Sequence, residues 1–114
     1  MSSPSSIQNF AHRASELHRL DAACLNAGVM MSSWREVNGV ESHVATNLVG
    51  SFLLACLLLP KLQASARQTG SRGRLSFVGT DVVFVADLRE LRTEGGIWKK
   101  LNDREQSEGW LWQR

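Results

Sequence analysis

Three short segments of the chain place polar side chains where they could contact a ligand. They are Leu25-Asn26-Ala27-Gly28-Val29, Thr46-Asn47-Leu48-Val49-Gly50 and the run from Gly73 to Thr80. Asn26 and Thr80 each follow a short apolar run, and open α/β sheets bind ligands at the carboxyl ends of such strands. An Asn side chain can also cross-link backbone segments or cap a turn, so a purely structural role stays open for Asn26, Asn47 and Thr80.

Other arrangements of reactive residues give weaker signals. The histidines His12, His18 and His43 lie on predicted helices, and none has the Ser and Asp partners that a hydrolase triad requires. Asp81 and Asp87 are six residues apart, a spacing that is typical of loop residues as well as of paired catalytic carboxylates. The sequence therefore gives no support to a hydrolase.

The two cysteines indicate the compartment and exclude one class of metal site. Cys24 and Cys56 form no CxxC pair and have no zinc-ligand spacing, so no structural zinc is expected. Both lie in apolar runs, which predicts buried, reduced thiols and a reducing compartment. Because the N-terminus also lacks the features of a signal peptide, we expect a cytoplasmic protein.

Composition and charge are those of a soluble globular chain. Hydrophobic residues make up 43% of the 114 residues and charged residues 21%, with a net charge of +2. The basic residues are scattered, so we expect no nucleic-acid partner. Residues 44–60 carry no charge, but their polar residues and final proline favour a mostly buried helix over a membrane span.

The periodicity of apolar residues predicts alternating helices and strands. A helix is expected over residues 5–19, a strand over 21–25, a long helix over 39–66 and a second strand over 75–78. Residues 32–38 are expected to form a loop, and 81–86 a strand extension or a buried loop. Short helices are expected over 88–93 and 97–106.

This order predicts an α/β fold with parallel strands. One face of the long helix should be buried along the residues that step by four, which are Val40, Val44, Leu48, Phe52 and Cys56. Two strands alone make a poor parallel sheet. We therefore expect the central βαβ portion of a Rossmann-like doubly wound sheet, about two strands with flanking helices.

Taken in order, the three segments resemble the middle of a short-chain dehydrogenase/reductase. The resemblance runs from about Ser5 to Asn102, and Leu101-Asn102-Asp103-Arg104-Glu105 is similar to an insert in members from fungal secondary-metabolite gene clusters. The resemblance implies an oxidoreductase that uses NADP or NAD on a small-molecule carbonyl/alcohol pair.

The resemblance also implies roles for individual residues. Asn26 matches the Asn-Ala-Gly turn beside the cofactor, and Lys61 lies where some relatives have a basic residue near the cofactor. Asn47 matches the helix asparagine that holds a proton-relay water. Thr80 lies where the family has its catalytic serine, and its hydroxyl could bond a substrate carbonyl.

The chain departs from the family in two places. It contains no tyrosine, and the positions four residues before Lys99 and Lys100 are glycines, so no Tyr-x-x-x-Lys motif is present. The 25 residues before Asn26 contain no glycine and therefore no Gly-rich phosphate loop. The interpretation is a partial domain over residues 1–114 with little activity of its own. Alternatives are an interaction module that pairs through the 39–66 helix with itself or an intact relative, or a decayed gene product.

Overall fold

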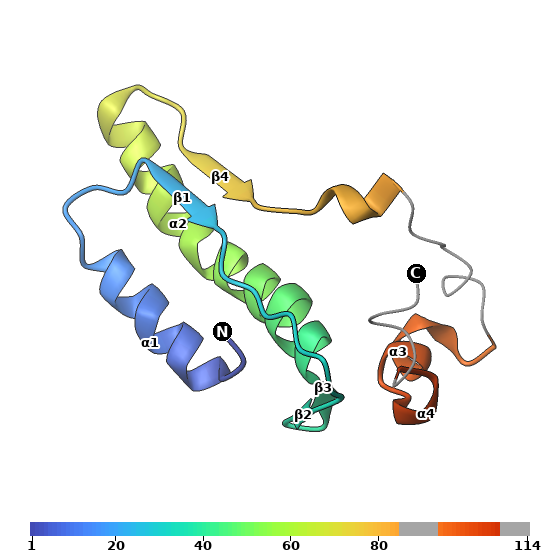
Figure 1. Cartoon of the computed structure of the whole chain (residues 1–114). Helices are drawn as coiled ribbons and strands as arrows, with labels where there is room; N and C mark the ends of the chain where they lie inside the picture. The colour runs from blue at the N-terminus through green and yellow to red at the C-terminus, as the bar shows by residue number, and fades with distance from the viewer. Residues whose placement is uncertain (85–93, 108–114) are drawn as a thin grey trace.

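The computed structural model describes residues 1–84 and 94–107 (Figure 1). Its elements are, in order, α1 (Pro4–Ser15), β1 (Ala22–Leu25), β2 (Glu36–Val37), β3 (Val40–Glu41), the π-helix η1 (Val44–Gly50), α2 (Ser51–Thr69), β4 (Arg74–Phe77), the 3-10 helix η2 (Asp81–Phe84), α3 (Gly96–Leu101) and α4 (Arg104–Ser107).

The first helix begins at a polar cap. Ser3 is the N-cap, and its hydroxyl accepts a hydrogen bond from the Ser6 N–H at 3.4 Å, while Pro4 occupies the first turn. The helix ends at Ser15, four residues earlier than predicted. Its buried residues, Ile7 and Ala11, lie four apart and face α2.

The two predicted strands pair in parallel and are joined by the long helix. The register runs from Ala22 opposite Arg74 to Leu25 opposite Phe77. The result is a small parallel sheet with flanking helices, which confirms the α/β prediction and is consistent with a partial Rossmann-like fold.

One apolar core holds these elements together. It lies between α1, α2 and one face of β1, and its buried members are Ile7, Ala11, Leu25, Leu54, Ala55, Leu58 and Leu62. Burying each aliphatic side chain of Val, Leu or Ile type contributes about 1.5–3 kcal/mol. On the other face of β1, Ala22 and Cys24 are exposed. Cys56 is exposed as well, so the prediction of buried thiols was wrong for both cysteines, although both are free.

A hairpin replaces the predicted start of the long helix. β2 and β3 pair antiparallel, and the turn between them has left-handed backbone at Asn38 (φ 54°) and Gly39 (φ 78°). An Asn-Gly turn of this kind matches the twist of a two-residue hairpin. The loop predicted over 32–38 holds for 32–35 and for the turn residue 38, but 36–37 form a strand, and the helix start predicted at Gly39 was wrong.

The long helix also presents a different face to the core than its sequence suggested. Of the predicted stripe, Val44 is buried, but Phe52 is 55% exposed and Leu48 is 38% exposed. The core is formed instead by Leu54, Leu58 and Leu62. The predicted stripe steps by four residues, which drifts by about 40° per step around an α-helix of 3.6 residues per turn. By Phe52 and Cys56 it has therefore left the face that α2 buries.

By length and composition, the continuous helix Val44–Thr69 could cross a membrane. Its most apolar window has a mean hydropathy of 1.6, and 39% of that window is buried within the structure. The buried part is the face against α1 and β1. The core helix of a soluble protein has the same character, so the expectation of no membrane span stays a prediction.

After β4 the chain turns into short helices. Residues 81–84 form η2 rather than a strand, and the helix predicted over 97–106 is divided into α3 and α4. The helix predicted over 88–93 lies outside the described residues.

Candidate functional site

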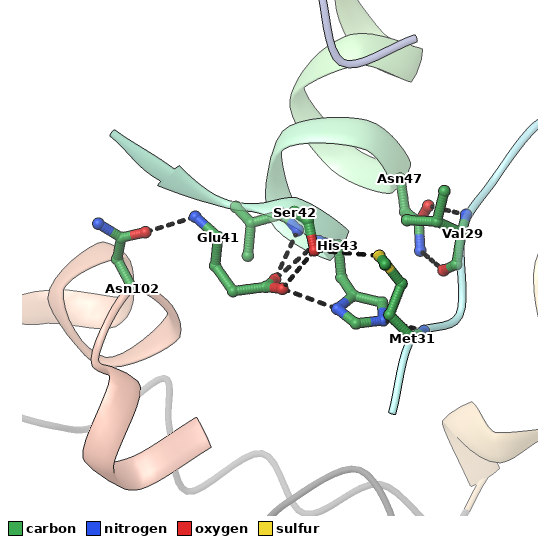
Figure 2. Close-up of polar contacts among 8 residues, drawn as sticks. Val29, Met31, Glu41, Ser42, His43, Asn47 and Asn102 are labelled. Atoms are coloured by element: carbon green, nitrogen blue, oxygen red, sulfur yellow. Dashed lines mark hydrogen bonds and ion pairs between the residues drawn. The ribbon is translucent and has the colours of Figure 1, made fainter. Parts of the chain in front are cut away.

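The centre of the candidate site is a pair of hydrogen bonds between Asn47 and Val29. The Val29 N–H donates to Asn47 Oδ1 at 2.8 Å, and Asn47 Nδ2 donates to the Val29 carbonyl at 2.9 Å (Figure 2). The Asn47 side chain thus binds the loop after β1 as a neighbouring strand would. One N–H of the amide is left for another partner, since each Asn side chain has two.

Two local features allow this contact. A Cβ atom on Gly28 would lie 3.1 Å from Asn47 Oδ1, so a residue without a side chain lets the amide approach. Asn47 also lies in η1, where π-turns disturb the regular backbone hydrogen bonds, and the Ser51 hydroxyl donates to the Thr46 carbonyl there at 3.3 Å. Single π-turns of this kind occur frequently at functional sites.

A buried carboxylate caps the beginning of this helix. Glu41 is 5% exposed, and its Oε2 accepts the backbone N–H groups of His43 at 2.8 Å and Val44 at 3.1 Å. Burial raises the pKa of Glu41, but hydrogen bonds from His43, Val44 and Ser42 outweigh burial and hold the pKa below its ordinary value of 4.5. Glu41 is therefore a fixed negative charge at this helix N-terminus.

His43 connects the cap to the loop after β1. Its Nε2 accepts the Met31 N–H at 2.8 Å, and its Nδ1 lies 2.8 Å from Glu41 Oε1. A backbone N–H can only donate, so Nε2 accepts and the ring proton is placed on Nδ1. Figure 2 shows the resulting line of contacts from Glu41 through His43 to Met31.

The segment after η2 is attached to the same region by Asn102. Asn102 Oδ1 accepts the Glu41 N–H at 2.6 Å, and its Nδ2 donates to the Gly39 carbonyl at 2.9 Å. The guanidinium of Arg104 lies 5.8 Å from the centre of the Trp34 ring. These contacts hold α3 and α4 beside the hairpin and the loop after β1.

The predicted site residues fall into two groups. The first group lies at the carboxyl ends of the two parallel strands. Asn26 follows β1 and Thr80 follows β4, and Asn47 is hydrogen-bonded to Val29 in the loop after β1. Asn26 and Thr80 are both exposed, as a ligand contact requires, and the Thr80 hydroxyl lies 3.3 Å from Asp81 Oδ1. Lys61 lies fourteen residues after Asn47, about 21 Å further along the helix axis, and the structure does not bring it to this edge.

Sequence reasoning missed three residues that make these hydrogen bonds, namely Glu41, His43 and Asn102. Sequence analysis gave Glu41 no role, treated His43 only as a helix residue and treated Asn102 only as part of an insert. A local signal existed for Glu41, since an acidic residue just before a helix can cap it. No local signal existed for Asn102, because its partners Gly39 and Glu41 are more than 60 residues away.

The N-terminus of the long helix does not fit the phosphates of a dinucleotide. A phosphate binds well at a helix N-terminus because the first N–H groups are free. At the long helix, Glu41 already accepts the N–H groups of His43 and Val44 and adds its own negative charge. The carboxyl ends of β1 and β4 instead carry the Asn26 amide and the Thr80 hydroxyl, which can hydrogen-bond a neutral polar group.

Comparison with known proteins identifies relatives over most of the chain. It is 37% identical over 107 residues, 94% of its length, to the short-chain dehydrogenase anuD of Penicillium roqueforti, of which it covers 28%. It is 37% identical over 102 residues to the short chain dehydrogenase FGM9 of Gibberella zeae, of which it covers 30%. It is 42% identical over 77 residues to the chloroplastic short-chain dehydrogenase TIC 32 A of Brassica napus, of which it covers 24%.

The chain thus spans less than a third of the length of these curated relatives. No protein-family model and no solved structure matches it.

Proposed function

Because this chain belongs to the short-chain dehydrogenase/reductase family, we propose that it supplies the central βαβ segment of an NAD(P)-dependent oxidoreductase that interconverts carbonyl and alcohol groups. The observation that supports this most directly is the 37% identity to anuD over 94% of the chain. The parallel β1–β4 pair, with polar residues after both strands, is the architecture that such a segment needs.

In this proposal Asn26, Asn47 and Thr80 form one edge of the site. Thr80 has the hydroxyl that would bond a substrate carbonyl, and Asn47 has one amide N–H left for a water molecule. Asn26 would contact the cofactor beside β1. Lys61 is the weakest assignment, because it lies far along α2 from the other three residues.

We further propose that the 114-residue chain has no turnover by itself. Proton transfer to a carbonyl oxygen needs an acid with a suitably lowered pKa, and the family's acid is a tyrosine. The sequence has no tyrosine, and Glu41 occupies the N-terminus of the long helix beside the site. The proposed role therefore requires a complete partner domain or a longer chain.

A specific observation also favours the second candidate, a non-catalytic interaction module. The side of α2 away from the core exposes Phe52, which stacks at 5.0 Å on the exposed Phe77, and Leu59 is 41% exposed. Exposed apolar surfaces of this kind are typical of protein contacts. In that role the chain would associate with another protein and never meet a substrate.

A chimera tests the oxidoreductase proposal. The region of anuD that matches residues 5–102 would be replaced by those residues of this chain, and NADPH and NADH binding would be followed by cofactor fluorescence. We expect the chimera to bind cofactor, and Thr80→Val to reduce carbonyl reduction at least tenfold while Thr80→Ser retains it. Thr69→Ser, on the far end of α2, is the control.

Two outcomes would contradict the proposal. A folded chimera whose reductase activity is indifferent to Thr80→Val would remove Thr80 from the site. Cofactor-dependent reduction of a carbonyl by the unmodified 114-residue chain would show that it needs no partner domain.

A further inference from the structure

A short strap, residues 30–34, runs between β1 and the hairpin beside the candidate site (Figure 1). Hydrogen bonds that do not titrate fix the chain on both sides of it. Before the strap, the Asn47 amide binds the N–H and the carbonyl of Val29. After the strap, the Arg35 carbonyl accepts the Ser42 N–H at 2.8 Å. Movement of the strap is therefore confined to the residues between these two points.

One strong hydrogen bond holds the beginning of the strap. The Met31 N–H donates to His43 Nε2 at 2.8 Å, and Figure 2 shows the imidazole ring between Met31 and Glu41. The Ser42 hydroxyl lies 3.8 Å from Met31 Sδ, but it also lies 3.0 Å from Glu41 Oε1. A thioether is a weak acceptor, so this hydroxyl bonds the carboxylate. Among the described residues, the bond to His43 is the main polar contact of Met31.

The imidazole can accept this bond only while it is neutral. Both ring nitrogens of a protonated histidine are donors, so a proton on Nε2 would face the Met31 N–H and the bond would break. The Glu41 carboxylate favours the charged ring, because its Oε1 lies 2.8 Å from Nδ1. Hydrogen bonds hold the pKa of Glu41 below 4.5, so Glu41 stays ionised at pH 5–8, where histidines commonly change charge.

No second charge competes with Glu41 for the ring. In the part of the chain that the structure describes, Glu41 is the only charged group within ion-pair distance of His43. The strap has no titratable side chain. The other charged residues of the neighbouring segments lie beyond that distance, and they are Arg35, Glu36, Asp103, Arg104 and Glu105. Protonation therefore gives His43 an ion pair with Glu41, while the strap loses a hydrogen bond.

The closed strap also buries a polar group that lacks a partner. Trp34 Nε1 is buried and has no hydrogen-bond acceptor among the described residues. A buried donor without an acceptor costs free energy, because water would bond it if the strap opened. The closed position is therefore held against an opposing cost, and loss of the Met31 bond shifts the balance toward the open position.

We infer that residues 30–34 form a pH-controlled strap, which is closed while His43 is neutral and released when His43 is protonated. Release exposes the Trp34 indole to water beside the carboxyl end of β1, whereas Val29 stays bound to Asn47. This inference goes beyond the proposed oxidoreductase function. It holds for the 114-residue chain without cofactor or substrate.

Nuclear magnetic resonance of the ¹⁵N-labelled full chain between pH 8 and pH 5 tests the inference. The exchange rate of the Met31 amide, divided by its intrinsic rate at each pH, should rise at least tenfold as the pH falls. Its midpoint should equal that of the His43 ring protons. The Trp34 indole N–H should shift with the same midpoint, and the Val29 amide should stay protected throughout.

Three variants isolate the role of the ring. In His43→Gln the side-chain amide oxygen can accept the Met31 N–H near the position of Nε2 and does not titrate, so Met31 should stay protected from pH 8 to pH 5. His43→Phe has no acceptor and should leave Met31 unprotected even at pH 8, with circular dichroism to check the fold. His18→Gln, at an exposed position, is the matched control and should keep the wild-type transition.

Three results would overturn the inference. Equal protection of the Met31 amide at pH 8 and pH 5 would show that the charge of His43 does not control the strap. A transition that persisted in His43→Gln would assign it to another group. Loss of Val29 protection with the same midpoint would show acid unfolding of the whole region rather than release of the strap.

Discussion

Asn47, in the π-turn of the long helix, uses both ends of its amide on the backbone of one residue, Val29. The two distances, 2.8 and 2.9 Å, are those of strong hydrogen bonds. Helix and loop are thereby fixed to one another at the carboxyl end of β1, where an α/β sheet binds its ligand. The contact joins the fold and the candidate site, because the loop after β1 cannot move without breaking it.

The first prediction concerns this contact. Asn47→Ala should lower the free energy of unfolding by about 1–2 kcal/mol, because two hydrogen bonds are lost and the better helix propensity of alanine offsets part of the loss. Urea denaturation followed by circular dichroism gives the midpoint, and hydrogen exchange should show a faster Val29 amide. Gln63→Ala, at an exposed position of α2, is the control. An unchanged Val29 exchange rate would contradict the role assigned to Asn47.

A second prediction concerns Gly28. Gly28→Ala places a Cβ 3.1 Å from Asn47 Oδ1, so the amide must shift and the protein should lose about 1 kcal/mol of stability. Gly79→Ala is the matched control, because nothing lies within 4 Å of its added Cβ.

The double variant Gly28→Ala/Asn47→Ala isolates the coupling between the two positions. Once the amide is gone, Gly28→Ala should cost much less than it does alone. Strictly additive losses in urea denaturation would show that Gly28 acts independently of Asn47.

The third prediction is a pH dependence that comes from Glu41. The pKa of Glu41 is lowered in the folded state, so its contribution to stability is complete above the ordinary pKa of 4.5 and is lost as the pH falls through the folded pKa. Glu41→Gln should therefore be less stable than the wild type at pH 7, and the difference should shrink below about pH 4. Urea midpoints between pH 7 and pH 3 measure it.

Glu36→Gln, at an exposed position of the same hairpin, is the control for that experiment. It should leave the shape of the wild-type stability curve unchanged. A Glu41→Gln difference that is as large at pH 3 as at pH 7 would mean that Glu41 acts through packing rather than through its charge.

The sequence predicted the main elements because their signals are local. β1 and β4 are short apolar runs, and the helix between them has an apolar face that is visible in its periodicity. The Asn38-Gly39 turn was also visible, but the apolar residues after it were counted into the helix, so the hairpin was missed. With Val37 before it and Val40 after it, this dipeptide was the stronger signal.

Other features had no local signal. A π-turn is made of the same apolar residues as an α-helix, so nothing in the sequence predicted η1. The choice of buried face also failed, because a stripe stepped by four residues drifts away from Leu54 toward Phe52. The placement of Asn26 and Thr80 followed from the ends of β1 and β4, which are readable in sequence. Asn47 lies on a helix and reaches the same end of the sheet through its hydrogen bonds to Val29. The Glu41, His43 and Asn102 contacts depend on tertiary approach, which a single sequence does not record.

The last prediction concerns Asn102, which bonds both the Gly39 carbonyl and the Glu41 N–H. Asn102→Asp keeps the acceptor for the Glu41 N–H but turns the donor toward Gly39 into a second oxygen, so carbonyl and carboxylate would repel each other. Asn102→Ala removes both bonds. If Asn102 holds α3 and α4 on the hairpin, both variants should speed hydrogen exchange at the Glu41 amide, Asn102→Ala more than Asn102→Asp.

The same variants should change the environment of Trp34, because Arg104 is carried by the segment that Asn102 attaches. Mass spectrometry measures the hydrogen-exchange rates of the hairpin and of the core separately. The Leu54 and Leu58 amides of the core should keep wild-type protection. Asn9→Ala, at an exposed position of α1, is the control. Glu41 also caps the long helix, so a loss of protection that extended through α2 would show that the Asn102 contact stabilises the whole fold. Unchanged protection at the Glu41 amide would show that Asn102 does not attach α3 and α4 to the hairpin.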